Sequence, residues 1–273
     1  MTYEEFTVKS GGVALFCRRF GTGSPLLMIH GAGVDSDFFR ESAEYLSRQY
    51  RVFTYDRRGY GRSGDAGDVH TAALLAADAA AVCEATGQPC HIVAHSAGCA
   101  VALELTVARP ELVRSLILHE PPMLHGFVDE AAYREQIREL SRLVEGGRMA
   151  RASCLFYALL GDPDSRAREQ TDEELSHLER NMGTFLQKEL SLLDYTPNYD
   201  ALKQIPALVG LGELSRGQRH STAASQLAER LTCPLVSFPG AHNCAYDLPL
   251  AFAAMVSGLL TLQCESCSEN EIM

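Results

Sequence analysis

Short apolar runs alternate with longer helical patterns along most of this chain. The apolar runs predict strands at residues 25–30, 51–55, 90–95, 114–119, 206–211 and 234–238. Helical patterns fall at residues 37–48, 68–86, 97–108, 222–230 and 249–262. Because strands that alternate with helices pair in parallel and carry the helices on their faces, we predict an α/β fold with a mostly parallel, doubly wound sheet.

Two stretches depart from this alternation. Residues 5–20 alternate apolar and polar side chains around a Ser-Gly-Gly turn, which predicts an N-terminal hairpin. No strand pattern occurs between residues 121 and 200, where helical patterns fall at 130–144, 149–160 and 172–193. We therefore expect three parts: a core of residues 1–120 and 201–263, a helical cap of residues 121–200, and a polar tail of residues 264–273.

The length and the charge of the chain narrow the class of protein. A chain of 273 residues, 46% of them hydrophobic, is long enough to build one sizeable core. Its 24 basic and 35 acidic residues give a formal charge of −11, which argues against nucleic acid or an anionic membrane as a partner. No apolar run reaches the length of a membrane span and the first residues show no secretory signal, so we expect a cytoplasmic protein.

The cysteines and histidines show neither a disulfide framework nor a metal motif. The nine cysteines are scattered without regular spacing, and their odd number favours reduced thiols. The nine histidines form no ligand-like cluster along the sequence, so we expect no metal.

The most informative motif is the pentapeptide Ala-His-Ser-Ala-Gly at residues 94–98. It lies between the predicted strand 90–95 and a helical run of small residues, so Ser96 falls on a sharp strand-to-helix turn. Small neighbours suit a nucleophile elbow, because a strained backbone brings this turn close to the adjacent strand and helix. The alternative interpretation is that Ser96 caps a short helix.

Three further segments accompany this motif. His-Gly-Ala-Gly follows a strand at residues 30–33, Asp-Arg-Arg-Gly-Tyr-Gly-Arg-Ser follows another at 56–63, and Phe-Pro-Gly-Ala-His ends a third at 238–242. In this order the four segments resemble the α/β-hydrolase family, in its serine-nucleophile branch of esterases and haloperoxidases. The resemblance covers residues 6–262 and implies that the helical insertion is a cap or lid.

The resemblance implies a catalytic triad whose members follow in the order nucleophile, acid, histidine. Ser96 and His242 fit the first and last places. The position where this family usually carries its aspartate holds Ser215, which has no charge to stabilise an imidazolium. Glu120, at the end of the preceding strand, is the favoured substitute, since some family members place their acid there, and Glu213 is the other candidate.

An acyl-transfer site also needs hydrogen-bond donors for the oxyanion of the tetrahedral intermediate. The resemblance implies the backbone N–H groups of Ala97, after the nucleophile, and Ala32, in the turn after the first core strand. Gly31 lets this turn pass close to the substrate, and we expect His30 beside it mainly to hydrogen-bond the loop. Both are candidate substrate-binding residues.

These residues predict a serine hydrolase that needs no cofactor. It would cleave an ester, thioester or lactone of a small, fairly apolar molecule through an acyl-enzyme on Ser96. The alternative is a lyase, cofactor-free oxygenase or cyclase on the same fold, and a non-catalytic ligand receptor is a third interpretation. A serine instead of an aspartate at residue 96 argues against epoxide hydrolase and haloalkane dehalogenase chemistry. The substrate and the oligomeric state, a homo-oligomer included, stay open.

Overall fold

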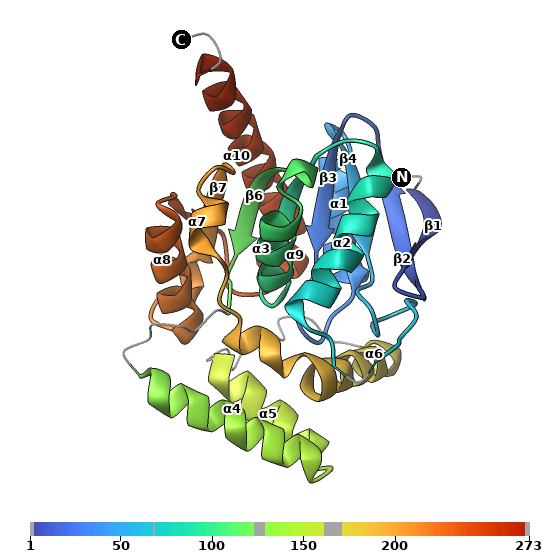
Figure 1. Cartoon of the computed structure of the whole chain (residues 1–273), viewed down its shortest axis with the longest axis vertical. Coiled ribbons are helices and arrows are strands. Elements are labelled where there is room, and N and C mark those ends of the chain that lie inside the picture. Colours follow the sequence, from blue (N-terminus) through green and yellow to red (C-terminus); the bar gives the residue numbers. More distant parts are fainter. Residues whose placement is uncertain (1–2, 68, 123–128, 161–170, 271–273) are drawn as a thin grey trace.

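The structure, a computed structural model, describes residues 3–67, 69–122, 129–160 and 171–270. Its centre is one sheet with strand order β1-β2-β4-β3-β5-β6-β7-β8 (Figure 1). β1 pairs antiparallel with β2 in the predicted hairpin, β2 pairs antiparallel with β4, and the other pairs are parallel, which confirms the predicted sheet. The strands are β1 Tyr3–Ser10, β2 Val13–Phe20, β3 Ser24–Ile29, β4 Tyr50–Tyr55, β5 Cys90–His95, β6 Val113–His119, β7 Ala207–Gly212 and β8 Leu235–Phe238.

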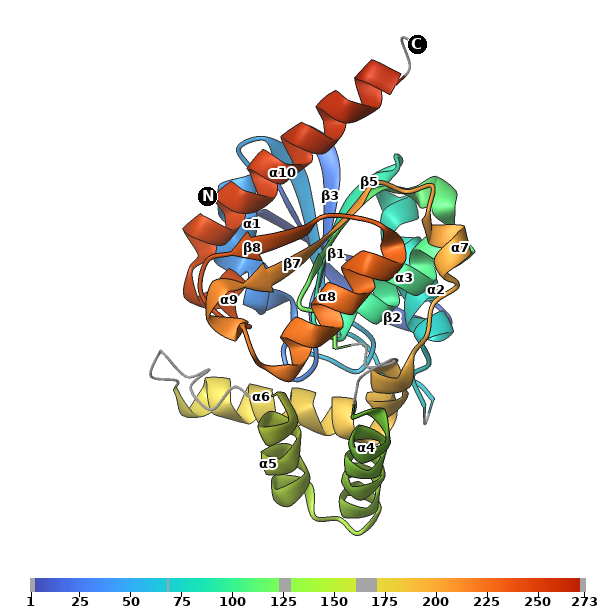
Figure 2. The ribbon, with the colours of Figure 1, turned by 90° about the vertical axis from the view of Figure 1, so that its left-hand side faces the viewer.

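Helices cover both faces of the sheet, as a doubly wound fold requires. Figures 1 and 2 show α1, α9 and α10 on one face and α2, α3 and α8 on the other. The helices of this part are α1 Arg40–Leu46, α2 Ala72–Thr86, α3 Gly98–Ala108, α7 Tyr199–Leu202, α8 Arg219–Leu231, α9 Cys244–Asp247 and α10 Pro249–Asn270. Three short 3-10 turns accompany them: η1 Ser36–Phe39, η2 Pro110–Leu112 and η5 Glu213–Ser215.

The alternation of side chains along β3 explains the two apolar layers. Leu27 and Ile29 pack in the layer beneath α2 and α3, whereas Leu26 and Met28 pack in the layer beneath α1 and α10. All four side chains are at most 1% exposed. A strand buried on both faces reads as a continuous apolar run, and each such side chain contributes about 1.5–3 kcal/mol to folding. The two layers hold the strand ends that carry the candidate site.

Several helix boundaries differ from the predicted ones. The pattern at 37–48 is divided into the 3-10 turn η1 and the helix α1, and α2 begins later than predicted, at Ala72. α8 begins at Arg219, earlier than predicted, so that His220 belongs to a helix and not to a loop. α10 continues to Asn270, through most of the expected polar tail, because no glycine or proline interrupts it there. None of the helices in the described part of the chain is long and apolar enough to cross a membrane.

The insertion after β6 is helical over its described residues. α4 Glu130–Glu145 and α5 Met149–Leu160 match the predicted helices, and Figures 1 and 2 show them with α6 at one end of the sheet. The prediction of one helix over residues 172–193 is wrong. α6 Asp172–Thr184 passes into a π-helical turn, η3 Phe185–Glu189, and a 3-10 turn, η4 Leu190–Asp194. A π turn is rare and is frequently found at functional sites, and here it buries Glu189.

Candidate active site

Ser96 occupies a tight turn between β5 and α3. Its backbone has φ 52°, a left-handed conformation that is strained for a residue with a side chain. The turn fits because Gly98 packs against β3, where a Cβ would lie 2.6 Å from the carbonyl oxygens of Ile29 and His30. The N-cap of α3 is Ala97, so the alternative interpretation of Ser96 as a helix cap is not supported. This is the geometry of a nucleophile elbow.

Glu120 follows β6 and contacts His242. It also has a left-handed backbone, with φ 48°, and its side chain is fully buried. His242 Nδ1 donates to Glu120 Oε2 at 2.6 Å, and the backbone N–H of Gly212 donates to Oε1 at 2.8 Å. Glu213, the other candidate acid, is exposed, and its Oε1 accepts a longer bond of 3.4 Å from the backbone N–H of Gly240. Of the two candidates, Glu120 is therefore the one paired with His242.

The charge of Glu120 suits it to stabilise a protonated imidazole. Burial alone would raise the pKa of this carboxyl group, but the hydrogen bond and charge of His242, together with the nearby His119 and His220, lower it further than burial raises it. The net effect holds the pKa well below its usual range, so Glu120 is ionised at neutral pH. Since the carboxylate can only accept, the Nδ1 proton of His242 faces Glu120, and Nε2 is left to accept a proton from a nucleophile.

A second histidine, His220, shares the same carboxylate. Its Nε2 lies 3.1 Å from Glu120 Oε2, and its ring centroid lies 5.0 Å from that of His242. This residue was not predicted from the sequence, because residue 220 precedes the helical pattern at 222–230. Because α8 begins at Arg219, His220 lies in the first turn of the helix that follows the penultimate strand, β7. The first turn of such a helix lies at the carboxyl end of the sheet, and this position is the signal that could have identified His220.

Glu120, His220 and His242 are also a candidate set of metal ligands. Each offers one ligand atom, and these atoms lie within 4.8 Å of one another. Two imidazoles and a carboxylate suit several divalent transition metals. Nδ1 of His242 and Oε2 of Glu120 already form a 2.6 Å hydrogen bond with each other. The proton-mediated pairing accounts for this contact without a metal.

The turn that holds Ala32 lies directly against Ser96. A Cβ on Gly31 would lie 2.9 Å from Cβ of Ser96, so only glycine fits there. Ala97, the residue after Ser96, is the N-cap of α3, where the first backbone N–H groups have no partner within the helix and the helix dipole favours negative charge. Both residues predicted to supply oxyanion donors therefore lie near Ser96, Ala97 next to it in the chain and Ala32 next to Gly31, which approaches it.

His30 is fully buried and bonds to loop backbone. Its Nδ1 lies 2.9 Å from the carbonyl oxygen of Gly31, and its Nε2 accepts a 2.9 Å bond from the backbone N–H of Arg57. Burial and the nearby charge of Arg57 hold the pKa of His30 well below its usual value, so the ring is neutral. This geometry agrees with the expected loop-holding role, and a substrate contact of His30 or Gly31 stays a prediction.

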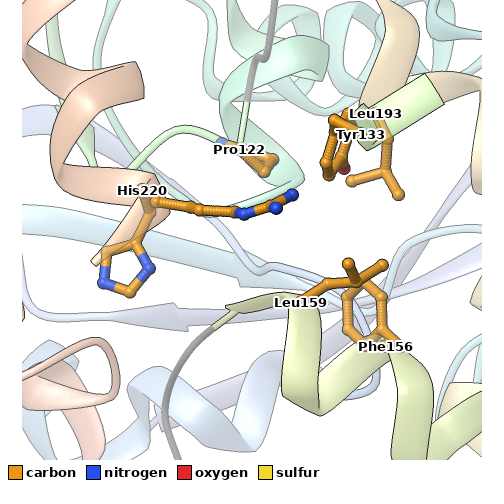
Figure 3. A pocket seen from close by; sticks show the side chains of 7 residues that line it. Pro122, Tyr133, Phe156, Leu159, Leu193 and His220 are labelled. Carbon is orange, nitrogen blue, oxygen red and sulfur yellow. The ribbon is translucent and has the colours of Figure 1, made fainter. Parts of the chain in front are cut away.

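An apolar cavity lies between the insertion and the candidate triad. Its volume is only about 20 Å³, and Figure 3 shows His220 on one side and Phe156 and Leu159 of α5 on another. The lining residues are Pro122, Tyr133, Phe156, Leu159, Leu193, Arg219 and His220. Because His220 also contacts Glu120, the cavity adjoins the Glu120–His242 pair.

The comparisons with known proteins agree with this fold. A sequence model of the Alpha/beta hydrolase family matches residues 26–255. The uncharacterized hydrolase YraK of Bacillus subtilis is 28% identical over 261 residues, which cover 89% of this chain and 91% of that protein. A pimeloyl-(acyl-carrier protein) methyl ester esterase of Aeromonas hydrophila is 35% identical over 100 residues, 36% of this chain and 38% of that protein.

A solved alpha/beta hydrolase from Sphaerobacter thermophilus superposes with a TM-score of 0.71 at 25% identity, covering 90% of this chain and 99% of that one. The match of the family model spans most of the chain, and the matches to YraK and to the solved structure extend over similar lengths. The chain therefore belongs to the alpha/beta hydrolase family.

Proposed function

We propose that this enzyme is a serine hydrolase that cleaves the ester, thioester or lactone of a small, fairly apolar molecule. The observation that carries the proposal is the buried, ionised Glu120 hydrogen-bonded to His242, with Ser96 held in a strained turn at the end of a neighbouring strand. A serine hydroxyl is a weak nucleophile at neutral pH and becomes reactive only beside an oriented base. The methyl ester esterase among its relatives supports an ester substrate.

The proposed reaction has two halves. Ser96 Oγ attacks the carbonyl carbon while its proton moves to His242 Nε2, and the N–H groups of Ala32 and Ala97 hold the oxyanion. The intermediate collapses, and the leaving alcohol or thiol takes the proton from His242. Water then gives a proton to His242 and attacks the acyl group, which leaves as the acid while Ser96 regains its proton. Glu120 stabilises the imidazolium in both halves.

The cavity limits the expected size of the acyl group. Its small volume of about 20 Å³ and its aromatic and aliphatic walls favour a short, apolar acyl group over a long chain. We propose that residues 121–200 act as the cap that closes this cavity over Ser96. A soluble small molecule, with no nucleic acid or membrane partner, is the proposed substrate class.

Steady-state and burst kinetics with p-nitrophenyl esters of increasing acyl length test the proposal. The wild-type protein should release p-nitrophenol in a burst and prefer short acyl chains, and Ser96→Ala should abolish turnover while remaining folded. Turnover that survives in a folded Ser96→Ala variant would contradict the acyl-enzyme. A wild-type protein with no activity on any ester, thioester or lactone would instead favour proton-transfer chemistry on this fold.

A further inference from the structure

A buried ion pair joins the core to the insertion, and the proposed chemistry does not use it. Arg57 follows β4 in the core and Glu189 ends the π turn η3, and both side chains are fully buried. Arg57 Nη1 donates to both carboxylate oxygens of Glu189, at 2.9 and 2.8 Å, and the Tyr60 hydroxyl donates to Oε2 at 2.7 Å. Since burying two charges costs several kcal/mol per ion, stability alone is a poor reason for this pair.

Arg57 also bonds to the turn beside the nucleophile. Its Nη2 donates to the carbonyl oxygen of Gly31 at 2.9 Å. His30 is neutral, and its Nε2 accepts from the backbone N–H of Arg57, so the ring proton is on Nδ1 and faces the same Gly31 oxygen at 2.9 Å. This carbonyl therefore accepts two hydrogen bonds from the core side of the loop.

The planarity of the peptide bond transmits this constraint to the next residue. The C=O of Gly31 and the N–H of Ala32 belong to one peptide unit, and in a trans peptide they point in opposite directions. Fixing the Gly31 oxygen therefore fixes the direction of the Ala32 N–H. Bonds to the carbonyl oxygen also polarise the unit and strengthen its N–H as a donor.

We propose that Glu189 is a positioning residue: by holding Arg57, it aims the Ala32 N–H at the oxyanion. The chain of contacts runs from η3 of the insertion through the guanidinium to the Gly31–Ala32 peptide. The inference rests on the proposed serine hydrolase function, in which Ala32 is an oxyanion donor. It makes correct docking of the insertion a condition for transition-state stabilisation.

The chain offers a matched control for this proposal. Arg58, the next residue, forms a similar buried pair with Asp78 of α2, with Nη2 and Oδ1 2.7 Å apart and side chains 2% and 1% exposed. That pair joins two parts of the core, and within the described residues the hydrogen bonds of Arg58 go to Asp78 and to the carbonyl oxygen of Ser10, not to the Gly31–Ala32 turn. Glu189→Gln and Asp78→Asn thus remove the same kind of charge at similar burial. Only Glu189→Gln removes the partner of an arginine that bonds to the Gly31–Ala32 turn.

The experiment measures kcat and KM of both variants with a short-chain p-nitrophenyl ester, at a temperature where circular dichroism shows each to be folded. Glu189→Gln should lower kcat about 10- to 100-fold with KM changed less than about twofold, because an oxyanion donor acts in the transition state. Asp78→Asn should keep kcat within about threefold of wild type. Equal losses in both variants, or a Glu189→Gln kcat within about threefold of wild type, would overturn the proposal.

Two further measurements keep the test decisive. If Glu189→Gln does not fold, the double variant Arg57→Met/Glu189→Leu removes the pair without leaving an unpaired buried charge, and it should show the same loss of kcat. The amide chemical shift of Ala32 in the NMR spectrum reports the turn without any reaction. It should move in Glu189→Gln and stay in place in Asp78→Asn. A wild-type enzyme that is inactive refutes the proposed function, whereas an unmoved Ala32 shift refutes this inference.

Discussion

Replacement of Glu120 by glutamine removes the charge that faces His242 while keeping the shape of the side chain. Two charges whose centres lie about 4 Å apart interact by about 4 kcal/mol at an effective dielectric constant of about 20. This stabilisation applies to the imidazolium that forms in the transition state. At about 1.4 kcal/mol per factor of ten, its loss corresponds to a decrease in kcat of about 10³-fold.

The hydrogen bonds around residue 120 give a second reason why Glu120→Gln should lower kcat. Oε1 of Glu120 accepts from Gly212 N–H and Oε2 accepts from His242 Nδ1, so both ends of the carboxylate are acceptors. Glutamine has only one acceptor end. If its oxygen faces Gly212, its NH₂ faces His242 and favours the tautomer with the proton on Nε2, which cannot take a proton from Ser96.

Hydrolysis of p-nitrophenyl acetate at pH 8, with circular dichroism to check the fold, measures this prediction. Glu213→Gln is the matched control, because Glu213 is exposed and bonds only weakly to the backbone of Gly240, so its kcat should stay within about threefold of wild type. A Glu120→Gln variant within tenfold of wild type, or a Glu213→Gln variant that loses as much, would refute the assignment of the acid.

The remaining predictions concern the turn, the cavity and acid stability. Gly31→Ala should reduce kcat more than 10-fold in the ester assay, because the new Cβ would lie 2.9 Å from Cβ of Ser96. Phe156→Ala should enlarge the cavity and shift the preference toward longer acyl chains in a p-nitrophenyl ester series, while lowering the unfolding free energy by about 3–5 kcal/mol in urea titrations. Because folding lowers the pKa of Glu120, its carboxylate stabilises the protein above the unfolded pKa of about 4.3, and this stabilisation is lost as the pH falls toward the folded value. Urea titrations from pH 6 to pH 3 should therefore show a steeper loss of stability in wild type than in Glu120→Gln, and parallel curves would contradict this linkage.

The sequence predicted the fold well because its signals are local. Each buried strand is a continuous apolar run, and the residues that end β3, β5 and β6 are followed directly by His30, Ser96 and Glu120. Parallel strands bring these ends to one edge of the sheet. The sequence alone therefore indicated that the three candidate residues lie near one another, before any distance was known. The choice between Glu120 and Glu213 needed the structure, because both follow strands that end at this edge.

His220 and Glu189 could not be predicted in the same way. His220 contacts Glu120 because α8 starts earlier than its apolar pattern indicates, and helix boundaries are weakly encoded in such patterns. Glu189 lies in the stretch 172–193, for which the pattern predicts only a helix, and its burial is tied to its ion pair with Arg57, far away in the sequence. Contacts between distant segments decide both positions, whereas periodicity reports only on neighbours along the chain.

The central claim is that Ser96 is an activated nucleophile, and labelling with a fluorophosphonate tests it most directly. The wild-type protein and its Ser96→Ala variant are treated in parallel, and their intact masses are recorded. If Ser96 is activated, the wild type gains one adduct and the variant gains none. A folded wild-type protein that remains unlabelled, or a variant labelled to the same extent, would contradict the activation of Ser96.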